Sequence, residues 1–391
     1  MELYDYAITG AGCSGMSLIN HLSTSTLSSK RVLLIDKQDK ETSERTWCFW
    51  SQKKPYFADI VFKSWDKVNF TYSHHSKTQS IFPWKYHCIR GADFYRSIQS
   101  QMAYRAQITF KKATLKSIYE NDDLAVLETD RGSYAANFVF NSIPNYDFYQ
   151  RGDAISLKQH FYGLFIETEE PIFEADCMTL MNFQPEIYAG AGFFYILPFT
   201  AHCALIEFTV FSENSWAVEK YRFYLDKFIK DYLHIRQFII TDTEKGVIPM
   251  TDYCFPERIG NFQMQIGTAG GMTKPSTGYT FRNIQRQSQK IVEHLEKYQN
   301  PFYSRQANTR FRFYDRLFLN IIRQYPEEST LIFRDLFLHN HFKKVFCFLN
   351  EETCLSTELS IFSKLRWNPF LESIKDLFLK KNMIYDWFHS S

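Results

Sequence analysis

The feature that most constrains this fold is a glycine-rich turn near the start of the chain. An apolar strand pattern at residues 4–9 runs into Gly10-Ala-Gly12-Cys-Ser-Gly15, after which apolar residues recur at helical spacing. In a strand–turn–helix unit of this kind, the first glycine permits the tight turn and the second lets a pyrophosphate approach the backbone. The third lets the helix pack on the strand, and free N–H groups at the helix start attract negative charge. The motif predicts a dinucleotide-binding α/β fold.

A second strand strengthens this interpretation because it ends in an acid. Residues 31–36 read Arg-Val-Leu-Leu-Ile-Asp, so Asp36 lies 21 residues after Gly15. A carboxylate at this position can accept hydrogen bonds from both hydroxyls of an adenosine ribose, whereas it would repel a 2′-phosphate. FAD or NAD is therefore favoured over NADP. A glycine-rich turn in an unrelated fold is the alternative.

Composition and charge narrow the class of protein further. The chain has 391 residues, more than the ~250–300 that usually share one core, so we expect two domains or one large two-part domain. Its net charge of +2 provides no basic field, and nucleic acid is not an expected partner. The eight cysteines include no Cys-x-x-Cys pair, so no metal site is predicted. No apolar run approaches the ~18 residues of a spanning helix and no signal-peptide pattern precedes the first strand, so we expect a cytoplasmic protein.

The pattern changes in the middle of the chain. Between residues 159 and 211, short apolar segments are separated by turn residues, which predicts an inserted antiparallel sheet. A strand at 264–266 then runs into a second glycine loop, and a helix is expected from about 281 to 298. A second loop of this kind suits a chain that wraps both ends of an extended cofactor, which favours FAD. The loop residues expected near the cofactor are Gly267, Thr268, Gly270, Gly271, Ser276, Thr277 and Gly278.

These patterns predict an α/β fold with three parts. We expect a Rossmann-like FAD-binding domain at residues 1–150 and 245–300, interrupted by an antiparallel β-sheet substrate domain at 151–244. Residues 301–391 are expected to form a helical C-terminal region. In the first domain the expected cofactor contacts are Gly10, Gly12, Gly15, Asp36 and Arg45. Arg45 precedes an aromatic segment at the point where the far end of a dinucleotide would lie, and a packed aromatic loop is the alternative for this segment.

One strand of the expected sheet carries a single acid. Alternation along residues 203–211 places Glu207 on one face with Leu205, Thr209 and Phe211. In an apolar, aromatic pocket, burial would raise the pKa of this carboxyl and keep it protonated near neutral pH. A neutral acid in a dry site can deliver a proton to a base as weak as an alkene. The alternative is that Glu207 faces solvent or pairs with a basic neighbour, and periodicity does not decide between them.

Four motifs taken together resemble the lycopene β-cyclase family of carotenoid biosynthesis, in its Bacteroidetes-type form. The resemblance extends from about residue 4 to about residue 370. The motifs are Gly10 to Gly15 with Asp36, Arg45-Thr-Trp-Cys-Phe-Trp50, Ile206-Glu207-Phe-Thr209, and Pro275-Ser-Thr-Gly-Tyr279. Their order and spacing carry the resemblance more strongly than any single motif.

The resemblance implies an FAD-dependent, non-redox enzyme with a flavoprotein monooxygenase-like fold. Its substrate would be lycopene, and its product would carry β-ionone rings. Glu207 matches the first acid of the family's Glu-Glu-Thr or Glu-Asp-Thr motif and would be the catalytic proton donor. The active flavin would be reduced, with NAD(P)H needed only as the priming reductant. This sequence departs from the family pattern at Phe208, Lys274 and Asn182, where the family usually has an acid, a histidine and an aspartate.

The implied substrate also implies a membrane partner. Lycopene is a C40 hydrocarbon that dissolves only in a bilayer, so we expect the enzyme to associate peripherally with the inner face of the cell membrane. Residues 329–349 have a basic and aromatic helical character suited to lying in a membrane interface. A helix packed on the protein core is the equally weighted alternative.

Two other functions remain open from sequence. An FAD monooxygenase or prenyl reductase could use the same scaffold, although the second loop has Gly267-Thr268 where the hydroxylases usually have Gly-Asp. A flavin-bound carotenoid carrier is the non-enzymatic alternative, and it would have little use for an acid on a dry strand.

Overall fold

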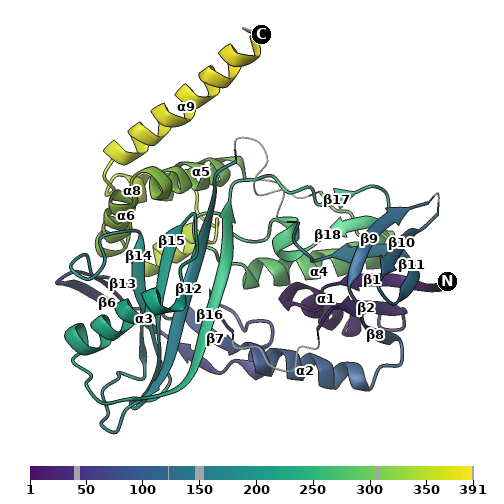
Figure 1. Ribbon diagram of the computed structural model, residues 1–391, viewed down its shortest axis with the longest axis horizontal. Helices are drawn as coiled ribbons and strands as arrows, with labels where there is room; N and C mark the ends of the chain where they lie inside the picture. The colour runs from purple at the N-terminus through teal and green to yellow at the C-terminus, as the bar shows by residue number, and fades with distance from the viewer. Residues whose placement is uncertain (39–44, 122, 146–153, 305–307, 390–391) are drawn as a thin grey trace.

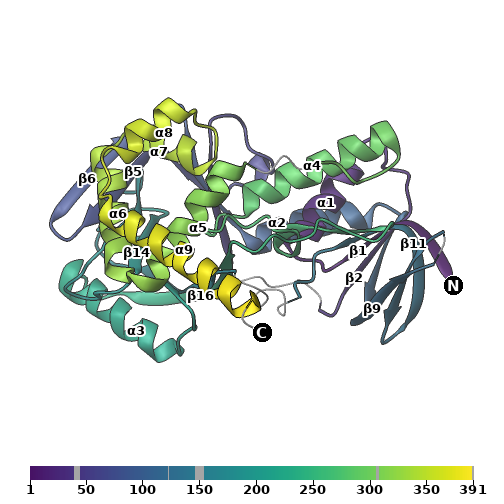
Figure 2. The same ribbon diagram turned by 90° about the horizontal axis from the view of Figure 1, so that it is seen from above.

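The computed structural model describes residues 1–38, 45–121, 123–145, 154–304 and 308–389, with side chains in the last helix as far as Leu379. Within these residues the chain forms an eight-stranded and a seven-stranded sheet side by side, joined by a small three-stranded sheet (Figure 1). Most of the helices near the C-terminus lie over the seven-stranded sheet (Figures 1 and 2). The expected α/β class, with an antiparallel sheet and a helical C-terminal region, is confirmed.

The eight-stranded sheet contains the two strands that were expected to carry the dinucleotide. Its main path is β17-β18-β11-β1-β2-β8, in which the strands from β18 to β8 pair in parallel with one another. β17, β10 and β9 pair antiparallel with their neighbours. The strands are β1 (Glu2–Thr9), β2 (Val32–Asp36), β8 (Ile108–Lys112), β9 (Leu115–Glu120), β10 (Ala125–Thr129), β11 (Gly132–Asn141), β17 (Arg258–Ile259) and β18 (Gln263–Gln265). Helices α1 (Cys13–Ser23), α2 (Gly91–Ala103) and α4 (Phe281–Tyr298) contribute to the apolar core on one face. The predicted helix at 281–298 is confirmed.

The seven-stranded sheet has the order β16-β12-β15-β14-β13-β5-β6 and is antiparallel except between β13 and β5. Its strands are β5 (Lys67–Tyr72), β6 (His75–Ser80), β12 (Ser156–Glu167), β13 (Cys177–Phe183), β14 (Gly192–Pro198), β15 (Cys203–Ser212) and β16 (Ile239–Thr251). Strand pairing thus adds β5 and β6, which come much earlier in the chain, to the strands that we expected at 151–244. The division of the chain into domains stays a proposal.

The remaining elements connect and cover these sheets. The small sheet has the order β3-β7-β4. Its strands are β3 (Thr46–Ser51), β4 (Lys63–Trp65) and β7 (Lys85–Arg90). Helix α3 (Val218–Lys227), continued by a π-helical turn (Phe228–Tyr232), covers one face of the seven-stranded sheet. The other helices are α5 (Thr309–Gln324), α6 (Pro326–His339), α7 (Phe342–Leu349), α8 (Leu355–Phe362) and α9 (Asn368–His389). Short 3₁₀ helices occur at Ala58–Ile60 and Gly267–Gly270.

Strand β15 is buried on both faces, which the alternation of its residues alone did not decide. Leu205 and Phe211 belong to the core cluster under α5 to α7, whereas Ile206, Phe208 and Val210 belong to the cluster under α3. Glu207 lies on the same side as Leu205 and Phe211. The strand therefore has no face open to solvent on which its single acid could lie.

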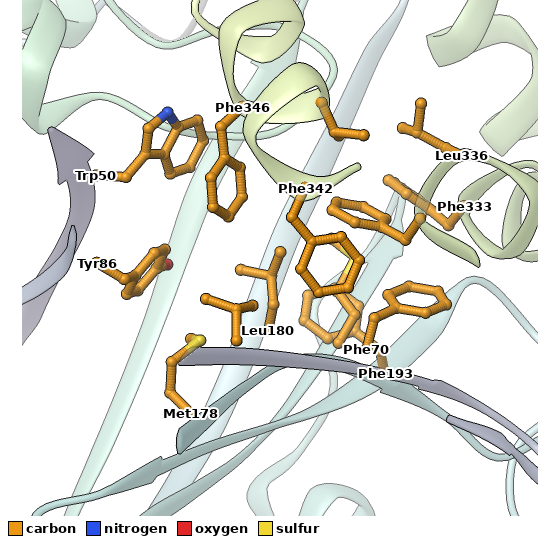
Figure 3. Close-up of a cluster of buried hydrophobic side chains, with 14 of the residues drawn as sticks. Trp50, Phe70, Tyr86, Met178, Leu180, Phe193, Phe333, Leu336, Phe342 and Phe346 are labelled. Carbon is orange, nitrogen blue, oxygen red and sulfur yellow. The ribbon is translucent and has the colours of Figure 1, made fainter. Parts of the chain in front are cut away.

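Residues 329–349 pack on the protein core. They form most of α6 and all of α7, and their aromatic side chains point toward the seven-stranded sheet (Figure 3). Phe337 stacks on Phe70 with ring centroids 4.9 Å apart, and Phe346 stacks on Trp50 at 4.7 Å. Phe342 is fully buried. Of the two alternatives for this segment, the structure thus favours core packing over a membrane interface.

Candidate functional site

The first glycine loop has the geometry that a dinucleotide requires. Gly10 adopts a positive φ of 92°, which favours glycine. A side chain at Gly15 would collide with the carbonyl oxygen of Gly10, so this glycine allows α1 to pack on the end of β1. A Cβ at Gly12 would meet nothing within 4 Å, and the start of α1 has no side-chain cap. The helix start therefore faces open space with its N–H groups available for an anion.

Asp36 lies at the end of β2, next to this turn. It is buried, and its Oδ2 accepts a hydrogen bond of 2.7 Å from the backbone N–H of Ala11. Its Oδ1 accepts one of 2.9 Å from the N–H of Gln38. The carboxylate thus holds the turn in place, beside the position that a bound ribose would take.

The second glycine loop reaches the first one. Gly267 has a positive φ of 62°, and a Cβ at this position would lie 2.6 Å from the Cβ of Ser14. The N–H of Gly267 donates a 2.8 Å hydrogen bond to Gln287 on α4, which anchors the loop. Two loops more than 250 residues apart in sequence therefore form one continuous surface.

A cavity of about 430 Å³ extends along this surface into the seven-stranded sheet. Six of the expected site residues line it: Gly12, Arg45, Glu207, Thr268, Thr277 and Gly278. Other lining residues come from β3, β7, β12 to β16 and the start of α4. The cavity thus joins the nucleotide end of the molecule to the acid on β15.

The other expected residues lie outside the lining of this cavity. Gly10, Gly15, Asp36 and Gly267 form the loops beneath it, and Gly270 and Gly271 line a neighbouring cavity of about 310 Å³. The hydroxyl of Ser276 donates a 2.5 Å hydrogen bond to Asp315 on α5. Because the side chain of Ser276 is bound there, we leave it out of the proposed site.

Three buried polar atoms along the cavity lack a hydrogen-bond partner among the residues that the structure describes. They are Ser14 Oγ, Gln159 Oε1 and Thr277 Oγ1. Unpaired buried polar groups are uncommon in native proteins, and each requires an explanation such as a bound ligand or water. One lies at the start of α1 and the other two lie near the second loop, as expected for an extended cofactor that contacts both loops.

Glu207 is buried, with 8 % of its surface exposed, and it lines the cavity. Its Oε1 accepts a 2.6 Å hydrogen bond from the hydroxyl of Thr209. Burial raises the pKa of Glu207, although the hydrogen bonds with Thr209 and with Glu244 partly oppose the shift. Glu207 forms no ion pair with any described residue. Its position makes it an acid that is protected from bulk water yet open to the cavity.

Glu244 on β16 is the residue that sequence reasoning missed. It is 3 % exposed, lines the same cavity, and lies within hydrogen-bonding reach of Glu207. Thr46 donates to it twice, from its N–H and from its hydroxyl, each at 3.1 Å. Burial, and then the charge of Glu207, raise the pKa of Glu244 well above its usual range. The site therefore holds two carboxyl groups in contact.

Comparison with known proteins identifies the family. The family model described as "Lycopene cyclase protein" matches residues 5–375. The chain belongs to the lycopene cyclase family. No curated protein matches this sequence significantly.

Solved structures share the fold of this lycopene cyclase family member at low identity. The flavin-dependent brominase Bmp2 has a TM-score of 0.61 and 13 % identity, with 97 % of this chain and 100 % of the other covered. A geranylgeranyl bacteriochlorophyll reductase-like protein from Thermoplasma acidophilum has a TM-score of 0.58 and 13 % identity, with 96 % and 100 % covered. A variant of the halogenase PltM in complex with FAD has a TM-score of 0.57 and 12 % identity, with 89 % and 82 % covered. The flavoprotein monooxygenase-like fold is thus confirmed.

In this lycopene cyclase family member, aromatic rings border the carboxyl pair. Tyr195 donates a 2.8 Å hydrogen bond to Tyr86, whose hydroxyl lies 3.1 Å from that of Tyr279. The ring of Trp50 meets that of Tyr279 edge to face at 4.4 Å. Burial raises the pKa of each of these three phenols, so they are neutral near pH 7. Such π faces can stabilise a cation by about 0.5–2 kcal/mol each.

A second cavity, of about 240 Å³, lies beneath the C-terminal helices of the protein. Its walls are almost entirely apolar side chains of α5 to α9, and Thr277 lines both cavities. Phe333 in this cavity stacks on Phe211 in the first one, with ring centroids 6.2 Å apart. Trp367 and Leu371, which are 54 % and 50 % exposed, line its outer end. The apolar cavity therefore adjoins the first one at Thr277 and at the stacked rings of Phe333 and Phe211, and its lining includes exposed side chains.

Proposed function

We propose that the protein is a lycopene β-cyclase that uses Glu207 as its acid and depends on reduced FAD. The observation that carries this proposal is a buried, raised-pKa carboxyl in a cavity shared with both glycine loops. The lycopene cyclase family match supports the substrate class. Neither observation alone would be sufficient, because the fold also serves halogenases and reductases.

We assign the FAD to the surface that the two loops form. The start of α1 with Gly12 would receive the pyrophosphate, and Asp36 would face the adenosine ribose. Ser14, Gln159 and Thr277 would pair their free polar atoms with the cofactor or its waters. When bound, reduced FAD supplies negative charge close to the cationic intermediates.

The proposed reaction consumes no net proton and no net electrons. Glu207 donates its proton to C2 of a lycopene ψ end, and the C1–C2 π electrons form the new C–H bond. The C5–C6 π electrons then attack the cation at C1 and close the ring. Loss of the C6 proton to the Glu207 carboxylate restores the C5–C6 double bond and the acid. The substrate and product therefore have the same mass, and NAD(P)H only primes the flavin.

Anaerobic incubation of the purified protein with reduced FAD and lycopene in liposomes tests this proposal. We expect a cyclised product of unchanged mass, with turnovers far exceeding the NAD(P)H consumed. Glu207→Gln keeps the shape of the side chain but cannot donate a carboxylic proton, so product formation should fall by about 10²–10⁴-fold. Parental activity in Glu207→Gln would remove this residue from the mechanism.

A flavin-dependent monooxygenase or prenyl reductase is the second candidate. The likeness to a geranylgeranyl bacteriochlorophyll reductase-like structure favours it, because that name implies an isoprenoid substrate. Such an enzyme would consume one NAD(P)H for each product and change the mass of the substrate. Product mass and NAD(P)H stoichiometry thus separate the two functions in one experiment.

We further propose that the apolar cavity receives the part of the polyene beyond the reacting end. Pockets of roughly 300–1,000 Å³ bury drug-sized ligands, and the first cavity lies near the lower limit while also facing the flavin. A forty-carbon chain needs more room, which the apolar cavity under α5 to α9 would supply. In the described residues no helix is long and apolar enough to cross a bilayer.

The membrane-facing surface would surround the outer end of this cavity. Exposed apolar side chains there belong to α8 and to the start of α9: Leu355, Leu359, Trp367, Leu371, Phe378 and Leu379. α9 extends away from the rest of the molecule (Figure 1), which makes its surface accessible to lipid. Tryptophan in particular prefers the membrane interface.

Flotation with anionic liposomes tests this surface. The double substitution Trp367→Ser with Leu371→Ser should reduce the membrane-bound fraction several-fold, because each buried apolar side chain contributes about 1.5–3 kcal/mol. Phe223→Ser on α3, at a side chain 64 % exposed, is the matched control and should bind as the parent does. Equal flotation of all three proteins would place the membrane contact elsewhere.

A further inference from the structure

The carboxyl pair is created by a glycine between two strands. On β12, Gly163 lies opposite Glu207 of β15 on one side and opposite Glu244 of β16 on the other. An ideal Cβ at Gly163 would lie 3.2 Å from Cγ of Glu244 and 3.4 Å from Cβ of Glu207. Any larger residue would therefore come between the two acids. Because position 163 carries no side chain, the carboxyl groups meet across the central strand.

Among the residues that the structure describes, the groups around the pair supply hydrogen bonds but no compensating cation. Thr209 on β15 donates to Glu207, and Thr46 on β3 donates to Glu244. Three phenols also face the pair, and burial raises the pKa of each, so they are uncharged near neutral pH: Tyr86 on β7, Tyr195 on β14 and Tyr279 after the second loop. Cys48 on β3 lines the same cavity. Arg45 lines the cavity with an exposed side chain, and among the described residues it forms no ion pair with either acid.

We propose that Glu244 is a permanently protonated carboxyl that donates its hydrogen bond to Glu207, and that it stabilises the Glu207 carboxylate after the proton has left. This inference rests on the proposed cyclase function and adds a second acid to it. When Glu207 transfers its proton to C2 of the substrate, the charge left on Glu207 receives hydrogen bonds from Glu244 and Thr209. The Glu244 proton stays on Glu244, the proton given by Glu207 stays on C2, and Glu207 is protonated again by the hydrogen that leaves C6.

The environment of the two acids supports this division of roles. Glu244 is the less exposed of the two, at 3 % against 8 % for Glu207, and burial raises the pKa of both. The hydrogen bond between them lowers the pKa of Glu207 and raises that of Glu244. A neutral Glu244 thus makes Glu207 a stronger acid than it would be alone in the same dry site. Preorganised donors of this kind are a large source of catalysis in water-excluded sites.

Two substitutions at Glu244 test the role of this donor. Glu244→Gln keeps a neutral donor of the same shape, and its amide can still accept from Thr46. We expect it to cyclise lycopene within about tenfold of the parental rate. Glu244→Met keeps the length but donates nothing, and should reduce the rate by about 10²–10³-fold. Binding of FAD, measured by flavin fluorescence, confirms that both variants are folded.

Either of two rate patterns would overturn the proposal. If Glu244→Gln is as slow as Glu244→Met, the carboxyl itself must ionise or transfer a proton. If Glu244→Met cyclises at the parental rate, the donor has no role. The alkaline limb of the rate profile, which reports loss of the Glu207 proton, should move to higher pH in Glu244→Met and stay near the parental position in Glu244→Gln.

An infrared titration of the protein without substrate separates this inference from the proposed function. Beside the band of protonated Glu207, the parent should show a second protonated carboxyl band at neutral pH that Glu244→Gln lacks. The control Glu351→Gln should keep that band, because Glu351 pairs with Lys274. Absence of the band from the parent would overturn the inference even if lycopene is cyclised. Its presence in a protein that produces no cyclised product would support the protonated pair and reject the cyclase proposal.

Discussion

Two clusters of buried acidic side chains in this protein lie at similar depth but differ in whether a cation pairs with them. Glu207 and Glu244 meet around Gly163 with no cation from the described part of the chain, whereas Asp315 receives hydrogen bonds from Lys274 at 3.1 Å and from Ser276 at 2.5 Å. Burial penalises charge in both places. In the first cluster we propose that the carboxyls avoid this penalty by staying protonated, whereas in the second an ammonium group compensates the charge. The presence or absence of a cationic partner, more than the depth of burial, therefore distinguishes the proposed reactive acids from the structural one.

The lysine cluster has a clear structural task. Lys274 Nζ also lies 2.8 Å from Glu351, so it ties the second glycine loop both to α5 and to the segment after α7. Burial alone would lower the pKa of Lys274, but the charges of Asp315 and Glu351 outweigh it and raise the pKa. In the family motif this position usually holds a histidine. Here the lysine fixes the loop that borders the cavity.

Replacing Lys274 should leave Asp315 without a cationic partner among the described residues, as Glu207 and Glu244 are. We expect this change to have the largest effect on stability. Lys274→Met leaves Asp315 buried without a charge partner, which should destabilise the protein by about 3–5 kcal/mol. Urea denaturation followed by circular dichroism measures this loss. Adding Asp315→Leu should recover most of it, since a buried ion pair can often be replaced by apolar residues. If Lys274→Met alone costs nothing, the ion pair does not stabilise the loop.

Filling the space at Gly163 should separate the carboxyl pair. In Gly163→Ala the new Cβ would lie 2.8 Å from Leu205 and press against both acids, so we expect a loss of about 1–3 kcal/mol from overpacking. Cyclisation should fall with it, because the hydrogen bond between the acids is disturbed. Gly12→Ala, which meets open space, is the stability control in FAD-free protein. Equal stability and unchanged turnover in Gly163→Ala would contradict the proposed contact.

A third effect concerns the pH dependence of stability. The folded protein holds the Glu244 proton to higher pH than the unfolded chain does, whose glutamates titrate near 4.5. The free energy of unfolding should therefore fall as pH rises above that value, by at most about 1.4 kcal/mol per pH unit for this group. Glu244→Gln removes this pH-dependent contribution to the free energy of unfolding. The stability of the variant relative to the parent, measured by thermal melts, should therefore increase from pH 5 to pH 8. Glu351→Gln should show no such gain.

Glu207, one member of the carboxyl pair, could be predicted from the sequence because the alternation of residues along its own strand determines which side it lies on. Alternation along β15 placed Glu207 with Leu205 and Phe211, and both glycine loops follow a strand and precede a helix, as their motifs require. Glu244 was not predicted because the burial pattern of β16 is the opposite of the usual one, in which apolar side chains are buried and charged side chains are exposed. Ile239 and Ile240 are exposed there, and the charged Glu244 is buried.

The other features that the sequence did not predict depend on contacts between residues far apart in the chain. The role of Gly163 depends on the pairing of three strands, which no single segment encodes. Ser276 belongs to a motif that suggested the cofactor, yet its hydroxyl is bound to Asp315, 39 residues away. The aromatic residues of 329–349 suited either a membrane or a core, and only the position of the seven-stranded sheet decided between them (Figure 3).

The origin of the hydrogen added at C2 tests the central claim most directly. If Glu207 exchanges its proton with water between turnovers and passes it to the polyene, reaction in D₂O under anaerobic, reduced conditions should place one deuterium in each ring formed. Mass spectrometry of the product measures this incorporation, and Glu207→Gln should form almost none of the labelled product. A ring that contains no solvent deuterium, or that takes its label from deuterated NAD(P)H, would contradict acid catalysis by the buried carboxyl.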